Sequence, residues 1–193
     1  MTTTEPSATT TAQAGVDISS LLVVGNDIRA EIEQFYFYEA ELLDDRRWND
    51  WQQLWTDDAH YWMPTRTNRS SREMKYEFSA PNELAHFDDN KTTLEWRTAQ
   101  LATGMHWAED PPSRTRHVVS NIRVRPSDVV DNEYETRSNF ICYRNRMEDE
   151  VDLWAGERHD VLRHLADGIW AVSRRKILLD QNVVLSKNLS ILF

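Results

Sequence analysis

The sequence has 193 residues, 40% of them hydrophobic, and its 32 acidic residues outnumber 22 basic ones to give a formal net charge of −10. Such a surface repels phosphate backbones, and no apolar run approaches the roughly 20 residues that span a bilayer, so nucleic-acid binding and membrane insertion are disfavoured. The N-terminus lacks the features of a signal peptide and Cys142 is the single cysteine, which together predict a cytoplasmic protein without disulfides.

The chain is predicted to form one domain behind an N-terminal tail. Residues 1–25 form a disordered or loosely ordered tail, and residues 26–193 a single domain large enough to bury a core. A helical period begins at Asn26, where Asn26 or Asp27 is placed to cap the first turn. Its apolar positions are Ile28, Ile32, Phe35 and Leu42.

Tryptophans mark the next two elements. A second, short helix is predicted to carry Trp48, Trp51 and Trp55 on one stripe. The residues Asp57-Asp58 are expected to form a turn. Residues 59–64 then alternate in the manner of a strand.

The middle of the chain is polar and irregular. Residues 65–90 predict a long surface excursion with room for one short strand. Asn90 is placed to cap a third helix over residues 91–103, with Gly104 as its C-terminal signal. The proline pair within residues 110–113 ends regular structure before the last third of the chain.

The last third predicts an antiparallel meander. Its strands are expected over residues 114–125, 134–147, 151–165 and 169–179, and their length predicts strong twisting. The apolar segment 182–193 should dock on another surface rather than remain in water. The order of elements indicates an α+β protein of the cone-like NTF2-like type, with about three helices on one face of a long twisted sheet.

Metal and thiol chemistry find little support in the sequence. His159 and His164, with Glu157 and Asp160 nearby, resemble an iron-binding triad, but residues five apart on a strand point to opposite faces. An iron–sulfur cluster needs more thiolates than one cysteine can supply. Cys142 alternates with apolar residues in a strand, which favours a buried structural thiol over a nucleophile.

Acid–base chemistry inside the cone stays open as an alternative. Such a site would need a carboxylate or imidazole whose pKa burial has moved toward 7. The competing interpretation, which we favour, is that the tryptophans and strand aromatics fill the same space. The candidates for the acid–base site are Asp57, Asp58, His60, Tyr61, His86 and His117.

Two basic clusters suggest contacts with another subunit. Residues 114–117 read Arg-Thr-Arg-His, and residues 174–176 read Arg-Arg-Lys within a strand. Cations in a central strand are costly unless they are paired. We therefore expect one face of the sheet to look toward a partner or toward solvent.

Several motifs in order resemble one known family. They are the segment 39–48, the strand 55–64 with its Tyr-Trp-Met-Pro ending, the segment 104–121 and the endings 174–181 and 188–193. Together they resemble the β subunits of bacterial aromatic-ring-hydroxylating dioxygenases, in particular the biphenyl, benzene and alkylbenzene branch. The resemblance covers nearly everything after residue 26.

The resemblance implies a scaffold without an active site of its own. The expected assembly is an α3β3 hexamer whose α subunit holds a Rieske [2Fe–2S] cluster and mononuclear Fe(II). A reductase and a ferredoxin would deliver electrons from NADH, and the complex would convert arenes to cis-dihydrodiols in aromatic hydrocarbon catabolism. The alternatives are a stand-alone cone-fold isomerase or dehydratase and a small-ligand-binding protein.

No catalytic, cofactor-binding or metal-binding residue is expected in this chain. The subunit contacts are instead predicted to involve the segment near 105–117, the second basic cluster and the apolar end. The predicted interface residues are Trp107, Arg114, Arg116, His117, Arg174, Arg175, Leu189, Ile191, Leu192 and Phe193.

Overall fold

The computed structural model describes residues 23–103 and 109–193. Helices come first, and a run of long strands follows. In chain order the elements are α1 (Asn26–Asp44), α2 (Trp48–Gln52), β1 (Trp55–Pro64), the 3-10 helix η2 (Met74–Tyr76), β2 (Ala85–Asn90), α3 (Lys91–Ala102), β3 (Arg114–Pro126), β4 (Glu133–Arg146), β5 (Glu150–His164) and β6 (Trp170–Leu179).

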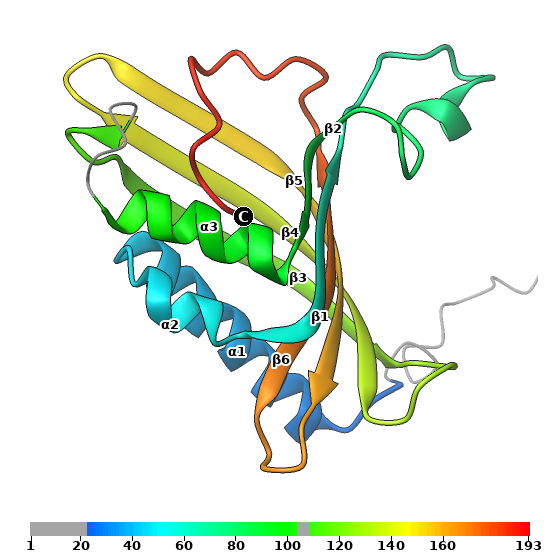
Figure 1. Ribbon diagram of the computed structural model, residues 1–193. Coiled ribbons are helices and arrows are strands. Elements are labelled where there is room, and N and C mark those ends of the chain that lie inside the picture. Colours follow the sequence, from blue (N-terminus) through cyan, green and yellow to red (C-terminus); the bar gives the residue numbers. More distant parts are fainter. Residues whose placement is uncertain (1–22, 104–108) are drawn as a thin grey trace, which may run out of the picture.

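The strands form one strongly curved sheet with the helices on one face (Figure 1). The strand order is β2-β1-β6-β5-β4-β3, and β3 to β6 form the antiparallel meander that the sequence predicts. The pairing of β1 with β6 is parallel, so the sheet is mixed rather than wholly antiparallel. This arrangement confirms the predicted α+β cone. Among the described residues, no helix is long and apolar enough to cross a membrane.

Two predictions about where elements begin were wrong, one for α1 and one for β1. Helix α1 begins after Gly25 with no side-chain cap, and Asn26 already lies inside the helix. Trp55 opens β1 instead of closing a helix, and Asp57-Asp58 lies within that strand rather than in a turn. The strand starts early because it pairs with β6: the Val172 N–H donates to the Leu54 carbonyl at 2.7 Å. The third helix does begin as predicted, with Asn90 accepting from the backbone N–H of Thr93 at 3.0 Å.

Aromatic side chains fill the space between the helices and the sheet. Trp51, Trp55, Tyr61 and Phe87 form a chain of edge-to-face contacts with ring centroids 5.1–5.7 Å apart. The last segment returns along the sheet and ends beside α3 (Figure 1). Phe193 there is fully buried, so the apolar end docks inside the chain's own core.

Candidate functional site

A buried ionic cluster occupies the inner face of the sheet, which is the face that the helices cover. Arg175 of β6 donates to Glu39 of α1 at 2.6 and 2.9 Å and to Asp160 of β5 at 2.8 and 3.0 Å. Arg158 approaches Glu39 at 3.3 Å. All four side chains are at most 3% exposed. We call Glu39, Arg158, Asp160 and Arg175 the buried ionic cluster.

Neighbouring side chains satisfy the same carboxylates. Trp51 donates its indole N–H to Glu39 at 3.1 Å, and the Tyr36 hydroxyl donates to Asp160 at 2.9 Å. Burial acts to raise the pKa of Glu39, but the two arginines outweigh it and hold that pKa below its ordinary value. Glu39 is therefore kept charged and paired, which is unsuited to accepting a proton near neutral pH.

The six candidates for acid–base chemistry are not brought together. Tyr61 lies in the core, where its hydroxyl accepts from the Phe193 N–H at 2.9 Å, and burial raises its pKa. His60 is exposed and bonds Asp88 at 2.7 Å. The remaining candidates lie at separate places: Asp57, Asp58 and His86 are exposed, and His117 lies against α1. The prediction that side chains fill the cone fits this arrangement.

His117 links three parts of the chain. Its Nδ1 lies 2.7 Å from Asp44 Oδ1, and its Nε2 lies 3.0 Å from the Leu192 carbonyl and 3.3 Å from Cys142 Sγ. This order of acid, imidazole and thiol resembles a catalytic triad. Burial, with Asp44 adding to it, raises the pKa of Cys142 and keeps the thiol protonated. The group therefore joins α1, β3, β4 and the last segment, and Cys142 is a structural thiol as predicted.

A third buried arginine, on β4, holds the last segment in place. Arg144 of β4 is 1% exposed and donates to Ser113 Oγ at 2.8 Å and to Asn188 Oδ1 at 2.9 Å. Ser190 in turn bonds Glu109. Two sequence motifs that lie far apart along the chain, near residues 109–117 and 188–193, are therefore one structural unit.

The donor atoms for a metal are not assembled in the part of the chain that the structure describes. No group of three or more His, Cys, Asp or Glu side chains there could hold an ion. His159 contacts Glu157, two residues away on β5. The sequence pattern that resembled an iron triad is an ordinary pair on a strand surface.

The structure corrects part of the predicted interface. Trp107 lies outside the described residues. Four other side chains are at most 5% exposed and belong to the chain's own core, so the interface prediction was wrong for them; they are Arg175, Ile191, Leu192 and Phe193. Their apolar or charged side chains suggested contact with another subunit, but they contact residues of the same chain instead.

The other predicted interface residues keep some surface. The side chains of Arg116 and Arg174 are 72% and 61% exposed, and Arg114 is exposed as well. Leu189 is half-buried. Contacts of these residues with another subunit stay a prediction. The His117 ring is 5% exposed and has its partners within the chain, so it belongs with the four buried residues.

Sequence reasoning missed the residues that hold the structure together. Glu39, Asp44, Arg144 and Arg158 all have buried partners. One signal was available for Glu39, which continues the buried stripe of α1 that includes Ile32. A carboxylate on an apolar helix face predicts a buried cation opposite it.

An exposed apolar strip lies on the outer face of the sheet, away from the helices. Its residues come from adjacent strands in register and are 42–58% exposed. Arg114 and Arg116 border it, because they are cross-strand neighbours of Asn145 and Tyr143. The apolar strip consists of Val118, Ile141, Tyr143, Val151 and Leu153.

Comparisons with known sequences point to one family. The sequence model described as ring hydroxylating beta subunit matches residues 38–186. The β subunit of benzene 1,2-dioxygenase from Pseudomonas putida is 44% identical over 171 residues, covering 88% of this chain and 91% of that protein. The β subunit of biphenyl 2,3-dioxygenase from Rhodococcus jostii has the same identity and coverage.

Solved structures share the fold at lower identity. Naphthalene 1,2-dioxygenase with bound indole contains a chain that matches with a TM-score of 0.74 and 20% identity, over 92% of this chain and 99% of that one. The β subunit of benzoate 1,2-dioxygenase from Burkholderia mallei matches with a TM-score of 0.62 and 22% identity, over 78% and 89%. A putative scytalone dehydratase from Novosphingobium aromaticivorans matches with a TM-score of 0.57 and 19% identity, over 80% and 85%.

Proposed function

Because this chain belongs to the family of ring-hydroxylating dioxygenase β subunits, we propose that it organises a separate catalytic α subunit into an α3β3 terminal oxygenase. The observation that carries the proposal is the 44% identity to the benzene and biphenyl dioxygenase β subunits over most of both chains. The same relatives support benzene-like or biphenyl-like arenes as substrates, with cis-dihydrodiols as products.

The redox centres belong to the α subunit in this proposal. A Rieske cluster needs two thiolates and two imidazoles. This chain has one cysteine, and burial keeps its thiol protonated, so its donor set does not fit a cluster. The α subunit would hold the [2Fe–2S] cluster and the mononuclear Fe(II), and electrons from NADH would reach it through a reductase and a ferredoxin.

The apolar strip supports a docking surface for the α subunit. Contiguous exposed apolar side chains on a soluble protein mark interaction sites, and permanent interfaces are more apolar than ordinary surface. Arg114 and Arg116 at its border would add charge-assisted bonds to carboxylates of the partner. Trp107 and Arg174 remain additional candidates for subunit contact.

Co-expression with the gene of a ring-hydroxylating dioxygenase α subunit tests the proposal. Wild-type chain should co-purify with an iron-containing α subunit in equal numbers. Leu153→Asp, which puts a charge in the centre of the apolar strip, should lower the recovered α subunit at least several-fold. Leu84→Asp is the matched control, because Leu84 is 79% exposed and lies outside the strip.

Two results would count against different parts of the proposal. Equal α-subunit recovery with both variants would contradict the docking surface alone. Stoichiometric iron or oxygen-dependent turnover in the purified chain by itself would contradict the assignment of the redox chemistry to a partner.

A further inference from the structure

A row of basic side chains crosses the outer face of the sheet at one level. Arg123 on β3 pairs in register with Arg137 on β4, Arg137 with His159 on β5, and His159 with Lys176 on β6. Residues directly opposite one another on neighbouring strands point to the same face. We call Arg123, Arg137, His159 and Lys176 the basic row.

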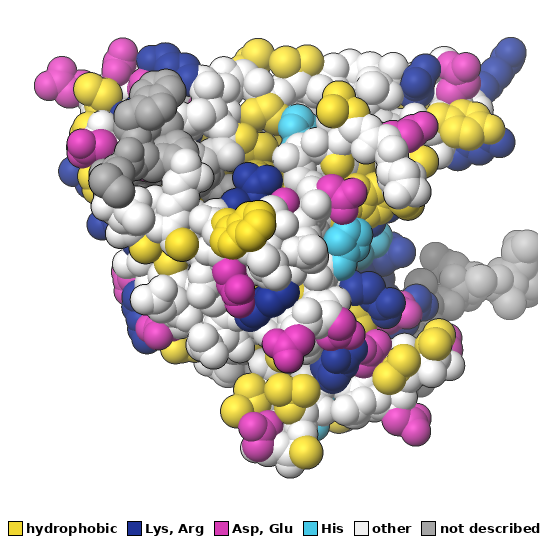
Figure 2. Space-filling model, in the orientation of Figure 1, with side chains coloured by type: hydrophobic (Ala, Val, Ile, Leu, Met, Phe, Trp, Pro, Cys, Tyr) yellow, Lys and Arg dark blue, Asp and Glu magenta, His cyan; other side chains and the backbone are white. Residues whose placement is uncertain are grey.

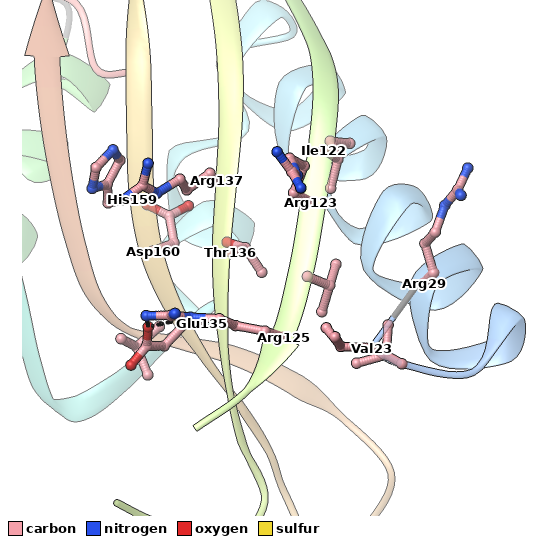
Figure 3. A pocket seen from close by; sticks show the side chains of 13 residues that line it. Val23, Arg29, Ile122, Arg123, Arg125, Glu135, Thr136, Arg137, His159 and Asp160 are labelled. Carbon is pink, nitrogen blue, oxygen red and sulfur yellow. Dashed lines mark hydrogen bonds and ion pairs between the residues drawn. The ribbon is translucent and has the colours of Figure 1, made fainter. Parts of the chain in front are cut away.

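Two members of the basic row have no counter-charge. Outside the backbone pairing of the sheet, neither the Arg123 nor the Arg137 side chain makes a hydrogen bond or an ion pair with any residue that the structure describes. By contrast, Arg125 binds Glu135 at 2.9 Å one level away, and Figure 3 shows that pair beside the basic row. Like charges directly opposite one another destabilise a sheet. Only Arg123 lies on an edge strand, so protection of an exposed edge does not explain the row.

Three members of the basic row, Arg123, Arg137 and His159, line a hollow of about 720 Å³. Apolar side chains such as Val23, Ile122 and Val161 form part of the remaining lining. Its other polar members are Arg29, Arg125, Glu135, Thr136 and Asp160, of which Arg125 and Glu135 pair with each other. Figure 2 shows Lys and Arg side chains together with histidine in the recess below the projecting excursion that follows β1. A positive, partly apolar recess on a chain of net charge −10 fits an acidic segment that also carries an apolar side chain.

Such a segment exists at the other end of the same sheet. In the turn between β4 and β5, Met147 is 57% exposed and is followed by the exposed pair Glu148 and Asp149. Neither carboxylate has a hydrogen bond or an ion pair among the described residues, whereas Glu150 is held by Lys187 at 2.6 Å. We call residues 147–149 the acidic tip.

The acidic tip and the hollow cannot meet within one chain. Arg137 and Arg146 are both on β4. Their nine-residue separation, at about 3.3 Å per residue, corresponds to about 30 Å along the strand. Complementary surfaces at opposite ends of one molecule are the arrangement from which head-to-tail rings form.

We propose that the acidic tip of one copy of this chain occupies the hollow of a second copy. Glu148 and Asp149 then neutralise Arg123 and Arg137, and Met147 contacts the apolar lining. The contact is heterologous, so each copy offers its tip to one neighbour and its hollow to another. This inference rests on the proposed function, because the contact would join β subunits of the same oxygenase. The apolar strip is not part of the contact and stays available to the α subunit.

Charge exchange tests this contact in the full-length chain. Arg123→Glu with Arg137→Glu, and separately Glu148→Lys with Asp149→Lys, should each reduce the particle mass measured by light scattering to that of one chain. Combining all four substitutions should restore the wild-type mass, because the charges again match. Arg69→Glu with Arg72→Glu makes the same charge change in the projecting excursion and should have no effect.

A carbodiimide provides a second measurement, since it joins a carboxylate to a nearby lysine. A link between Lys176 and Glu148 or Asp149 is expected, and mixing isotope-labelled with unlabelled protein should show that it joins two chains. A wild-type chain that stays monomeric and gives no link would overturn the inference, as would a fourfold variant that fails to reassemble although it is folded.

The co-expressed complex separates this inference from the proposed function. If the charge-reversed variants keep their mutual contacts but lose the α subunit, the hollow receives the catalytic partner and the inference is wrong. Wild-type chain that never co-purifies with an iron-containing subunit would instead contradict the proposed function, whatever the outcome of the charge exchange.

Discussion

Arg175 is the residue on which the interior depends most, and its removal gives the sharpest test of the buried ionic cluster. Its guanidinium bonds two carboxylates, Glu39 and Asp160, at 2.6–3.0 Å, and its side chain has no exposed surface. Replacement by Met preserves most of the volume of the side chain and removes the charge. Glu39 would keep Arg158 at 3.3 Å, while Asp160 would keep only neutral hydrogen-bond donors.

Removing one partner of a buried ion pair costs about 3–5 kcal/mol, because the remaining charge stays out of water without compensation. In a protein of this size each kcal/mol lowers the melting temperature by about 2–4 °C. We therefore expect Arg175→Met to lower it by about 6–20 °C. Adding Asp160→Asn should recover part of the loss, since it removes the carboxylate that is left uncompensated.

Circular dichroism during heating measures these shifts, with Arg174→Met as the matched control. Arg174 is the next residue on β6, its side chain is 61% exposed, and its ion pair to Glu133 measures 3.6 Å. Glu133 is itself buried, but it keeps Arg163 at 2.7 Å when Arg174 is replaced, so no carboxylate loses its only cation and the shift should be small. Equal shifts for Arg175→Met and Arg174→Met would refute the argument that the cluster is an essential part of the core.

Three further predictions concern other parts of the molecule. Phe193→Ala should lower the free energy of unfolding by about 3–5 kcal/mol, because it opens a cavity in the core. The control Leu185→Ala changes a side chain that is 90% exposed and should lower the free energy of unfolding by less than about 0.5 kcal/mol. Similar urea midpoints for the two variants would contradict the docking of the last segment. The hydrogen bonds from Arg163 lower the pKa of Asp58 from 3.8 to about 2 in the folded chain, so stability from this carboxylate is present above pH 3.8 and is lost as the pH falls toward 2. The urea midpoint of Asp58→Asn should accordingly lie below that of the wild type at pH 6 and approach it at pH 3, and a difference that does not depend on pH would argue against the pair. A thiol reagent should modify Cys142 only after unfolding, because the thiol is buried and its pKa is raised; rapid modification of the native chain would show otherwise.

Local patterns predicted most of the fold but not its long-range pairing. The alternation of apolar residues in the last third placed four strands nearly where β3 to β6 lie, and Asn90 marked the start of α3. The early start of β1 depends on β6, whose Val172 follows Trp55 by more than a hundred residues. A partner at that distance leaves no trace in the local spacing around Trp55.

The same limit explains the errors in the predicted interface. Three cations in succession on β6 correctly indicated that the charges needed partners, but charge alone does not say where the partner lies. Because successive side chains on a strand point to opposite faces, Arg175 points inward and bonds Glu39 of α1, whereas Arg174 points outward to solvent. The sequence did contain a clue, since Glu39 interrupts an apolar helix face and required a buried cation.

The predicted interface at the apolar end suggests deletion of residues 188–193 as a test of subunit contacts, but the structure changes what that experiment would report. Phe193 packs against Phe140 and Trp154 with ring centroids 5.3 and 5.9 Å away, and Arg144 and Arg175 both bond this segment. The deletion would therefore remove part of the core before it affected any interface. A lower yield of complex would not distinguish the two causes, whereas substitutions in the apolar strip, the basic row or the acidic tip change exposed side chains and leave the core intact. Because the inner face of the sheet is filled by the buried ionic cluster and the aromatic core, substitutions that test the proposed subunit contacts belong on exposed side chains such as those of the apolar strip.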